Sequence, residues 1–200
     1  MLTLALDTAT SRASCALIGD GELLGERESR AVAVLEAADE LLAGSGLVPG
    51  DLDRIVCGTG PGSFTGIRIG LATARGLALA LDLPLAGVST LAALAAGAPG
   101  SLPVIDGSRK EVFTLAEGDP VVTRPEELVL EPGALCVGDG AVRYRALLER
   151  AGAEIPPDSS ELHLVRARFH VALAADFGSG EEVEPIYLRV PDAEKALGSS

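Results

Sequence analysis

The stretch CGTGPGSFTGIRIGLATARGLALAL, residues 57–81, begins as a glycine-rich loop and continues as a long regular segment, which we predict to be a helix from about 65 to 81. A glycine-rich loop that leads into a helix commonly binds phosphate, because the first backbone N–H groups of the helix are free. Here the glycines continue into the helix itself, where each costs about 1 kcal/mol relative to alanine. The glycines therefore either help to bind an anion or let another backbone approach closely.

The phosphate hypothesis lacks its usual sequence motifs. A P-loop requires Gly-x-x-x-x-Gly-Lys-Ser/Thr, and no lysine follows the loop GPGSFTG at residues 60–66. The dinucleotide-binding pattern Gly-x-Gly-x-x-Gly begins at Gly58 and Gly60, but Ser63 takes the place of its last glycine. Free N–H groups at the start of the helix can still hold an anion, so nucleotide binding remains an alternative.

Small side chains form two rows along the predicted helix. Residues four apart lie on the same helical face, and small residues recur at 66, 70, 74 and 78, and again at 72, 76 and 80. Such rows allow close backbone approach, as in membrane dimers, although two arginines distinguish this helix from a membrane span. The approaching backbone belongs either to the protein's own sheet or to a helix of another subunit, and composition does not separate the two.

A faint internal repeat divides the chain. Asp7 ends one apolar run and Asp106 ends another, and a Gly-Asp turn begins twelve residues after each. The apolar run RIVCGTGPG ends in Gly-x-Gly, and so does the later run ALCVGDGAV. We therefore expect two α/β halves, residues 1–98 and 99–200, each with a hairpin followed by a strand, a Gly-x-Gly turn and a helix.

The expected elements follow from hydrophobic periodicity and from capping and turn signals. Two hairpins, each with an Asp at the first turn, form the skeleton of the duplicated actin-like ATPase fold, which is shared with sugar kinases and is RNase H-like, here with the second half reduced. That likeness concerns the fold and says little about chemistry.

In the first half we expect strands at 2–7, 14–19, 22–28, 53–58 and 84–88, with helices at 31–44, 65–81 and after the N-cap Ser89. In the second half we expect the hairpin and strand again, an irregular stretch at 123–133, helices at 141–151 and 161–176, and a closing strand at 183–189.

The motif GPGSFTGIRIGLATARGLALAL at 60–81, with LALDTAT at 4–10 and PIYLR at 185–189, closely resembles the TsaB family, also called YeaZ. That family supplies the dimerisation subunit of the bacterial machinery that makes threonylcarbamoyladenosine in tRNA. The resemblance spans essentially the whole chain, with a long and specific central motif and a looser match in the second half. It implies that the glycine-rich helix docks on another subunit. The implied interface residues are Gly62, Ser63, Phe64, Gly66, Arg68, Ile69, Gly70, Thr73, Gly76 and Leu77.

The resemblance implies a non-catalytic scaffold subunit. Its partner would be a TsaD-type catalytic paralogue, which transfers a threonylcarbamoyl group to N6 of the adenosine next to the tRNA anticodon. A TsaE-type ATPase is implied as a third protein, and a homodimer is another implied assembly. ATP and metal would be used by the partner subunits, with no cofactor bound by this chain alone. The formal net charge of −13 fits tRNA binding only through the complex, because affinity for a polyphosphate depends on Lys and Arg.

A stand-alone actin-like ATPase or small-molecule kinase is the alternative function. Asp7 and Thr8 stand where such enzymes place the Mg²⁺-linked carboxylate and the first phosphate-binding turn, but DTATS lacks the glycine that lets phosphate approach the backbone. A protease is not expected, because Ser63 does not lie in a Gly-x-Ser-x-Gly motif. Aspartates also commonly cap turns, so we expect a vestigial nucleotide site at most. Its residues would be Asp7, Thr8, Asp106, Gly138, Asp139 and Gly140.

We expect no metal site. The catalytic paralogue carries His-x-x-x-His on its first helix, whereas the matching stretch SRAVAVLEAADELL at 29–42 has no histidine. Many relatives keep one histidine near the start of this helix, where Arg30 or Ala31 stands in this chain. His163 and His170 lie on one predicted helix, about 10 Å apart by helical rise, which is too far to share one ion. We expect both imidazoles to be solvated or half-buried.

The remaining sequence signals concern the cellular compartment. Cys15, Cys57 and Cys136 each lie in an apolar run, which is typical of buried thiols in a reducing environment. The start MLTLALDTAT lacks the basic region of a signal peptide. Arg68 and Arg75 interrupt the most apolar segment. We therefore expect a cytoplasmic protein with no membrane contact.

Overall fold

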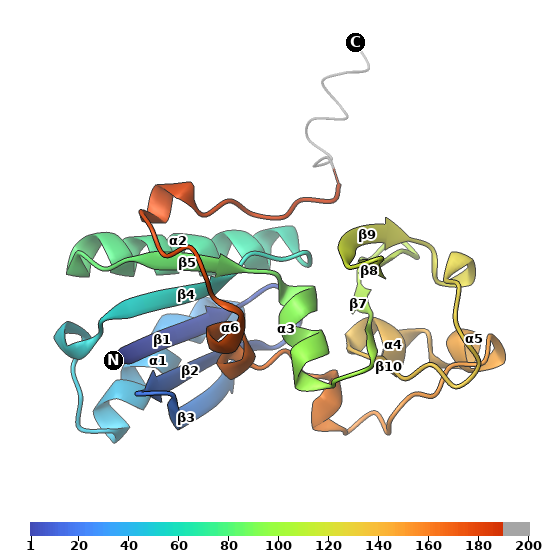
Figure 1. Cartoon of the computed structure of the whole chain (residues 1–200), viewed down its shortest axis with the longest axis horizontal. Coiled ribbons are helices and arrows are strands. Elements are labelled where there is room, and N and C mark those ends of the chain that lie inside the picture. Colours follow the sequence, from blue (N-terminus) through green and yellow to red (C-terminus); the bar gives the residue numbers. More distant parts are fainter. Residues whose placement is uncertain (190–200) are drawn as a thin grey trace, which may run out of the picture.

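A computed structural model describes residues 1–189, which form two lobes (Figure 1). The first lobe is built on a five-stranded sheet in the order β3-β2-β1-β4-β5. The neighbouring strands β1, β4 and β5 run parallel, whereas β2 is antiparallel to both β1 and β3. These strands lie where the sequence predicted them. Their bounds are β1 (Leu2–Asp7), β2 (Ala13–Gly19), β3 (Glu22–Ser29), β4 (Arg54–Gly58) and β5 (Leu85–Val88).

Helices cover both faces of this sheet (Figure 1). They are α1 (Val34–Gly44) and α2 (Phe64–Leu81) on one face, and α6 (Ala167–Leu173) with α3 (Thr90–Gly97) beside it on the other. Alternate residues of a strand face opposite sides, so Leu4 and Leu6 of β1 pack with α1 and α2, whereas Ala5 packs with α6. Both faces of β1 and β2 are buried, which explains why these strands are apolar almost throughout.

Helix α2 begins and ends at residues suited to those positions. The Ser63 hydroxyl accepts a hydrogen bond from the Gly66 N–H at 3.3 Å, an N-cap that satisfies one free donor of the first turn. Asp82 ends the helix in a left-handed conformation with φ of 55°. Among the described residues, α2 is the one helix whose length and hydropathy would suffice for a membrane span. It packs on the sheet of the first lobe with one side buried.

The glycine row of α2 lies against the turn that follows β1. A Cβ atom on Gly66 would lie 2.1 Å from the Thr8 carbonyl oxygen, and one on Gly70 would lie 2.2 Å from the Thr8 hydroxyl oxygen. That hydroxyl donates a 2.6 Å hydrogen bond to the Gly66 carbonyl. The two buried glycines thus allow a close approach within the chain and offer no surface to a partner, which corrects the predicted interface at these two positions. Gly76 is exposed, and a Cβ there would meet nothing within 4 Å.

The second lobe repeats the strand order of the first in reduced form. Strands β7, β8 and β9 form an antiparallel sheet, and β6 pairs in parallel with β10. Only Val104 separates β6 from β7, so these two short strands together correspond to β1 of the first lobe. The order β9-β8-β7/β6-β10 then matches the order β3-β2-β1-β4. Within residues 1–189 this lobe has no counterpart of β5. The elements are β6 (Leu102–Pro103), β7 (Ile105–Asp106), β8 (Val112–Ala116), β9 (Asp119–Thr123), β10 (Cys136–Val137), α4 (Asp139–Arg143) and α5 (Arg145–Arg150). Short 3-10 turns lie at Ala31–Ala33, Pro49–Asp51, Pro125–Glu127, Glu161–His163 and Gly180–Glu182.

The C-terminal part of the chain differs from the sequence-based expectation. The helix predicted at 161–176 is a 3-10 turn followed by the shorter α6, and the predicted strand at 183–189 is extended chain without a strand partner of its own. Val165 lies in the core of the second lobe, whereas Ala167 lies under the sheet of the first. Within the described residues, the chain therefore returns from the second lobe to the first between Val165 and Ala167.

Alanine substitutions at Gly70 and Gly76 should change stability in opposite directions. Gly70→Ala places a methyl group against Thr8, and we expect the free energy of unfolding to fall by about 1–3 kcal/mol. Gly76→Ala meets open space and should raise it by about 1 kcal/mol through helix propensity. Urea denaturation of both variants measures the two shifts. Equal shifts would contradict the packing of the glycine row on Thr8.

Candidate functional site

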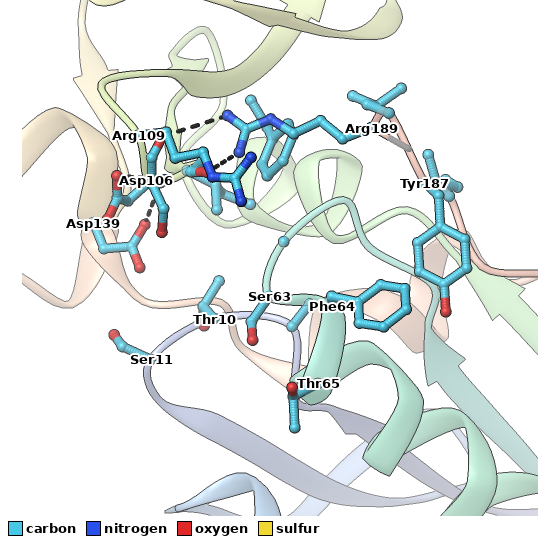
Figure 2. A pocket seen from close by; sticks show the side chains of 18 residues that line it. Thr10, Ser11, Ser63, Phe64, Thr65, Asp106, Arg109, Asp139, Tyr187 and Arg189 are labelled. Atoms are coloured by element: carbon cyan, nitrogen blue, oxygen red, sulfur yellow. Dashed lines mark hydrogen bonds between the residues drawn. The ribbon is translucent and has the colours of Figure 1, made fainter. Parts of the chain in front are cut away.

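A cleft of about 680 Å³ lies between the two lobes (Figure 2). Hydroxyl groups of Thr10, Ser11 and Ser63 lie on the side of the first lobe, and acidic and basic side chains lie opposite on the second lobe. The C-terminal segment 186–189 forms a further wall. The lining residues are Ala9–Ser11, Gly62–Thr65, Ile105–Arg109, Phe113, Asp139 and Ile186–Arg189.

Asp7 is sealed away from this cleft. Its side chain is 1% exposed, and its Oδ2 accepts a hydrogen bond from the Thr90 hydroxyl at 2.7 Å and lies 2.8 Å from His170 Nε2. Its Oδ1 accepts the Ala9 N–H at 2.7 Å. Gly58 lies directly beneath, since a Cβ there would be 2.0 Å from Oδ2. A nucleotide-bound metal would have to displace these protein groups to reach the carboxylate.

The residues of the expected vestigial nucleotide site in the second lobe, Asp106 and Asp139, are likewise engaged by the protein. Asp106 pairs with Arg143 at 2.9 Å, and its other oxygen accepts the Ser108 N–H at 3.0 Å. Asp139 accepts the Asp106 N–H at 2.9 Å. Burial raises the pKa of Asp139, and the nearby Asp106 carboxylate adds to that rise. Of the six predicted vestigial residues, only Asp106 and Asp139 line the cleft.

Each of the two histidines contacts a residue of the expected vestigial nucleotide site. His170 contacts Asp7, while His163 Nδ1 accepts the Gly138 N–H at 3.1 Å, so that Nε2 carries the proton and donates to the Pro156 carbonyl. Both imidazoles are buried, at 0% and 7% exposure, which corrects the expectation of solvated or half-buried side chains on one helix. Among residues 1–189 no group of three or more His, Cys, Asp or Glu side chains is arranged to hold a metal ion.

The glycines beside these turns are required for packing. Gly138 has φ of 108°, and a Cβ on it would lie 2.3 Å from the Val104 carbonyl oxygen. A Cβ on Gly140 would lie 2.8 Å from the Ile105 carbonyl carbon. The Gly-x-Gly motif therefore brings α4 against the β6–β7 segment, and this accounts for its glycines without a bound nucleotide.

The cysteines are buried free thiols, as the sequence predicted. Burial raises the pKa of Cys15 and of Cys136 to about 11, and it raises that of Cys57 as well. Since the thiolate is the reactive form, these thiols are protonated and inert near neutral pH. They serve as small apolar core residues.

An exposed stripe runs along α2 on the side away from the sheet. The stripe consists of residues 65, 69, 72, 76 and 79. Their spacing alternates between four and three, which is typical of a helix that packs on another helix. Because β3 and β4 are parallel, α1 and α2 begin at the same edge of the sheet, and the 3-10 turn before α1 contacts α2. Val32 and Leu35 there are 73% and 51% exposed. We call this region the α1–α2 surface: Val32, Leu35, Thr65, Ile69, Ala72, Gly76 and Leu79.

The predicted interface residues are distributed over several environments. The exposed Gly76 and the half-buried Ile69 belong to the stripe, and Thr73 and Leu77, which are also half-buried, lie beside it. The sequence-based list omitted Thr65, Ala72 and Leu79, although the four-and-three spacing would have identified them; Leu79 is 86% exposed. Gly62, Ser63 and Phe64 line the cleft at the start of α2, and Arg68 is exposed and contacts Tyr187, which the list also omitted.

A C-terminal segment, residues 178–189, runs along α2 and on to the second lobe (Figure 1); we call it the strap. The Arg75 guanidinium donates to the Gly180 and Val183 carbonyls at 2.9 and 2.6 Å. The Ile186 N–H donates to the Thr59 carbonyl at 2.8 Å. Both arginines of α2 therefore bind the strap: Arg75 donates to its backbone carbonyls, and Arg68 donates to the side chain of Tyr187.

Comparison with known proteins gives consistent matches. A family model described as TsaD, tRNA N6-adenosine threonylcarbamoyltransferase, matches residues 27–132. The tRNA threonylcarbamoyladenosine biosynthesis protein TsaB of Haemophilus influenzae is 32% identical over 219 residues, which cover 93% of this chain and 92% of that protein. The protein of the same name from Escherichia coli strain K12 is 43% identical over 102 residues, which cover 49% of this chain and 44% of that protein.

Solved structures support the fold. YeaZ from Pseudomonas aeruginosa has a TM-score of 0.77 at 28% identity, with 94% of this chain and 99% of that chain covered. Component A of Acidaminococcus fermentans (R)-2-hydroxyglutaryl-CoA dehydratase has a TM-score of 0.53 at 11% identity, with 87% and 97% covered, a likeness of fold alone. Together with the repeated strand order, these matches confirm the predicted duplicated actin-like fold.

Removal of His170 should destabilise the protein strongly, because it leaves a cavity in the core and leaves the buried Asp7 carboxylate with only the Thr90 hydroxyl and the Ala9 N–H as partners. We expect His170→Ala to lower the free energy of unfolding by about 3–5 kcal/mol. In the double variant with Asp7→Asn the loss should be smaller than the sum of the single losses, with a coupling of about 1–3 kcal/mol. Urea denaturation of the four proteins measures this cycle. Additive losses would show that the pair does not act as a unit.

Asp139→Asn should become relatively more stable as the pH rises. An aspartate whose folded pKa is raised stabilises the fold below its unfolded pKa, and this contribution is lost as the pH rises through the folded value. The asparagine does not titrate, so the difference in unfolding free energy should shift in favour of the variant from about pH 4 upward. Urea midpoints across the acidic range test this. A pH-independent difference would contradict a raised pKa.

Proposed function

Because the chain belongs to the TsaB family of tRNA threonylcarbamoyladenosine biosynthesis proteins, we propose that it is a non-catalytic subunit of a tRNA threonylcarbamoyltransferase complex. In this proposal it binds and activates a TsaD-type catalytic paralogue in the cytoplasm. The paralogue transfers the threonylcarbamoyl group to N6 of the adenosine next to the anticodon. A TsaE-type ATPase joins the complex, and ATP and metal are bound by those partners.

The observation that carries this proposal is the α1–α2 surface. Its apolar side chains Val32, Leu35 and Leu79 are between 51% and 86% exposed in the isolated chain. Ala72 and Gly76 between them are small, so that a helix of the partner can approach α2 closely. Burial of such apolar surface favours association by about 25 cal/mol per Å² before the costs of binding are subtracted. The same surface would serve a homodimer.

The sealed vestigial site supports the non-catalytic role. A stand-alone ATPase or kinase would need the Asp7 carboxylate at the cleft, where it could act on a Mg²⁺-bound nucleotide. His170, Thr90 and Ala9 occupy this carboxylate instead. The net charge of −13 further supports a division of labour in which a partner binds the tRNA.

A charged residue in the stripe should prevent assembly without unfolding the subunit. We expect Ala72→Glu to weaken binding of the TsaD-type protein from the same organism at least about tenfold, because the contact would desolvate an unpaired carboxylate. Sedimentation velocity of the mixture measures association, and mass spectrometry of tRNA nucleosides measures the modification. Modification should fall in parallel with association.

Ala146→Glu is the matched control, since Ala146 is also an exposed helical alanine but lies on α5 of the second lobe. It should assemble and support modification like the unaltered protein. If Ala72→Glu assembled normally, the α1–α2 surface would not be the docking site. ATP turnover by the lone chain, above that of a mock preparation and abolished by Asp7→Asn, would favour the stand-alone ATPase.

A further inference from the structure

We propose that the strap transmits the occupancy of the α1–α2 surface to the cleft between the lobes. This inference rests on the proposed function, because it requires a partner on that surface, and it adds a means by which binding affects the second lobe. The link is a cluster of Phe64, Arg68 and Tyr187 at the start of α2.

The cluster joins α2 to the strap through contacts that water reaches. The Arg68 guanidinium lies 3.8 Å from the centroid of the Phe64 ring, and Arg68 Nε donates to the Tyr187 hydroxyl at 3.3 Å. The Phe64 and Tyr187 rings are 5.1 Å apart, and they are 37% and 39% exposed. Contacts between a cation and aromatic rings are weak in water and strengthen several-fold when they are desolvated.

A partner on the stripe would cover this cluster. Arg68 and Ala72 are separated by four residues and are therefore neighbours on the same side of α2. A helix that packs over Ala72 also excludes water from the contact between Arg68 and the Phe64 ring. Docking then strengthens the contact of Arg68 with Phe64 and its hydrogen bond to Tyr187, so the strap is held more firmly at this point.

The strap has one firmly held end. Arg75 donates to its Gly180 and Val183 carbonyls, and Val183 is 9% exposed, with a side chain that packs beside Gly87 of β5. These contacts are partly or wholly removed from water and lie at the C-terminal half of α2. This end stays in place whether or not the surface beside Arg68 is covered.

The other end reaches the second lobe two residues after Tyr187. Arg189 donates to the Gly107 carbonyl and pairs with Glu111, both in the turn between β7 and β8. Its guanidinium also lies 5.2 Å from the centre of the Phe113 ring. A firmer hold on Tyr187 therefore restrains Arg189 and, with it, the β7–β8 turn.

The same segment forms a wall of the cleft, which Ile186, Tyr187, Leu188 and Arg189 all line. In Figure 2 Arg189 lies across the cleft from Ser63 and Thr10, and Tyr187 lies beside Phe64. When Tyr187 is released the second lobe can open, and when Tyr187 is held the wall is fixed. Docking on α2 thus shifts the population toward a closed cleft through contacts that the partner itself does not make with the second lobe.

Hydrogen exchange with mass spectrometry tests the coupling. Amides of residues 105–116 should exchange about fivefold more slowly in the complex with the TsaD-type protein than in the lone chain, as expected for strengthening one partly exposed cluster. Tyr187→Ala removes the link but leaves the stripe unchanged, so its complex should show no such slowing. Val129→Ala truncates another exposed apolar side chain, 93% exposed in the second lobe, and should retain it.

Sedimentation velocity on the same samples separates the two proposals. Absence of a complex would overturn the proposed function, and the coupling with it. A complex in which exchange of residues 105–116 is unchanged would overturn the coupling alone. So would equal slowing in the complexes of the unaltered protein and Tyr187→Ala, since the strap would then not be the route.

Discussion

The close approach of α2 to the turn after β1 is the constraint on which the rest of the structure depends. Gly66 and Gly70 allow the Thr8 backbone and hydroxyl to lie directly against the helix. This contact fixes which side of α2 faces inward, and therefore which residues are left for the exposed stripe and which for the strap. A helix with alanine at these positions would have to move away from the sheet. Its buried side, its exposed stripe and its strap-binding residues would then all be displaced together.

An actin-like fold normally places two aspartate-bearing turns around a nucleotide, and this chain engages both turns itself. His170 contacts the Asp7 carboxylate, Arg143 pairs with Asp106, and His163 accepts the N–H of Gly138 in the neighbouring Gly-x-Gly turn. The His163 imidazole satisfies the buried Gly138 N–H, and the His170 imidazole adds a third partner to the buried Asp7 carboxylate. The two lobes thus keep the paired arrangement of the actin-like fold, while the chain's own side chains engage both aspartate-bearing turns.

The sequence predicted those elements that local patterns determine. The strands of the first lobe, α2, the capping Ser89 of α3 and the reduced duplicate followed from hydrophobic runs and turn residues. Periodicity could not assign the two small-residue rows of α2, because both satisfy the same spacing and only the position of Thr8 decides which one is buried. It also missed the strap and the histidine contacts, since each depends on partners more than a hundred residues away or on backbone carbonyls that carry no sequence signal.

The return of α6 to the first lobe makes that lobe discontinuous in sequence. Its sheet begins at Leu2, yet one face is covered by Ala167 and its neighbours, and Val183 belongs to the core on the other face. During translation the ribosome must therefore deliver most of the chain before the lobe begun first can bury its sheet, whereas the lobe begun second can be completed earlier. The order of synthesis and the order of completion are inverted, and the nascent first lobe is the part that needs protection from aggregation.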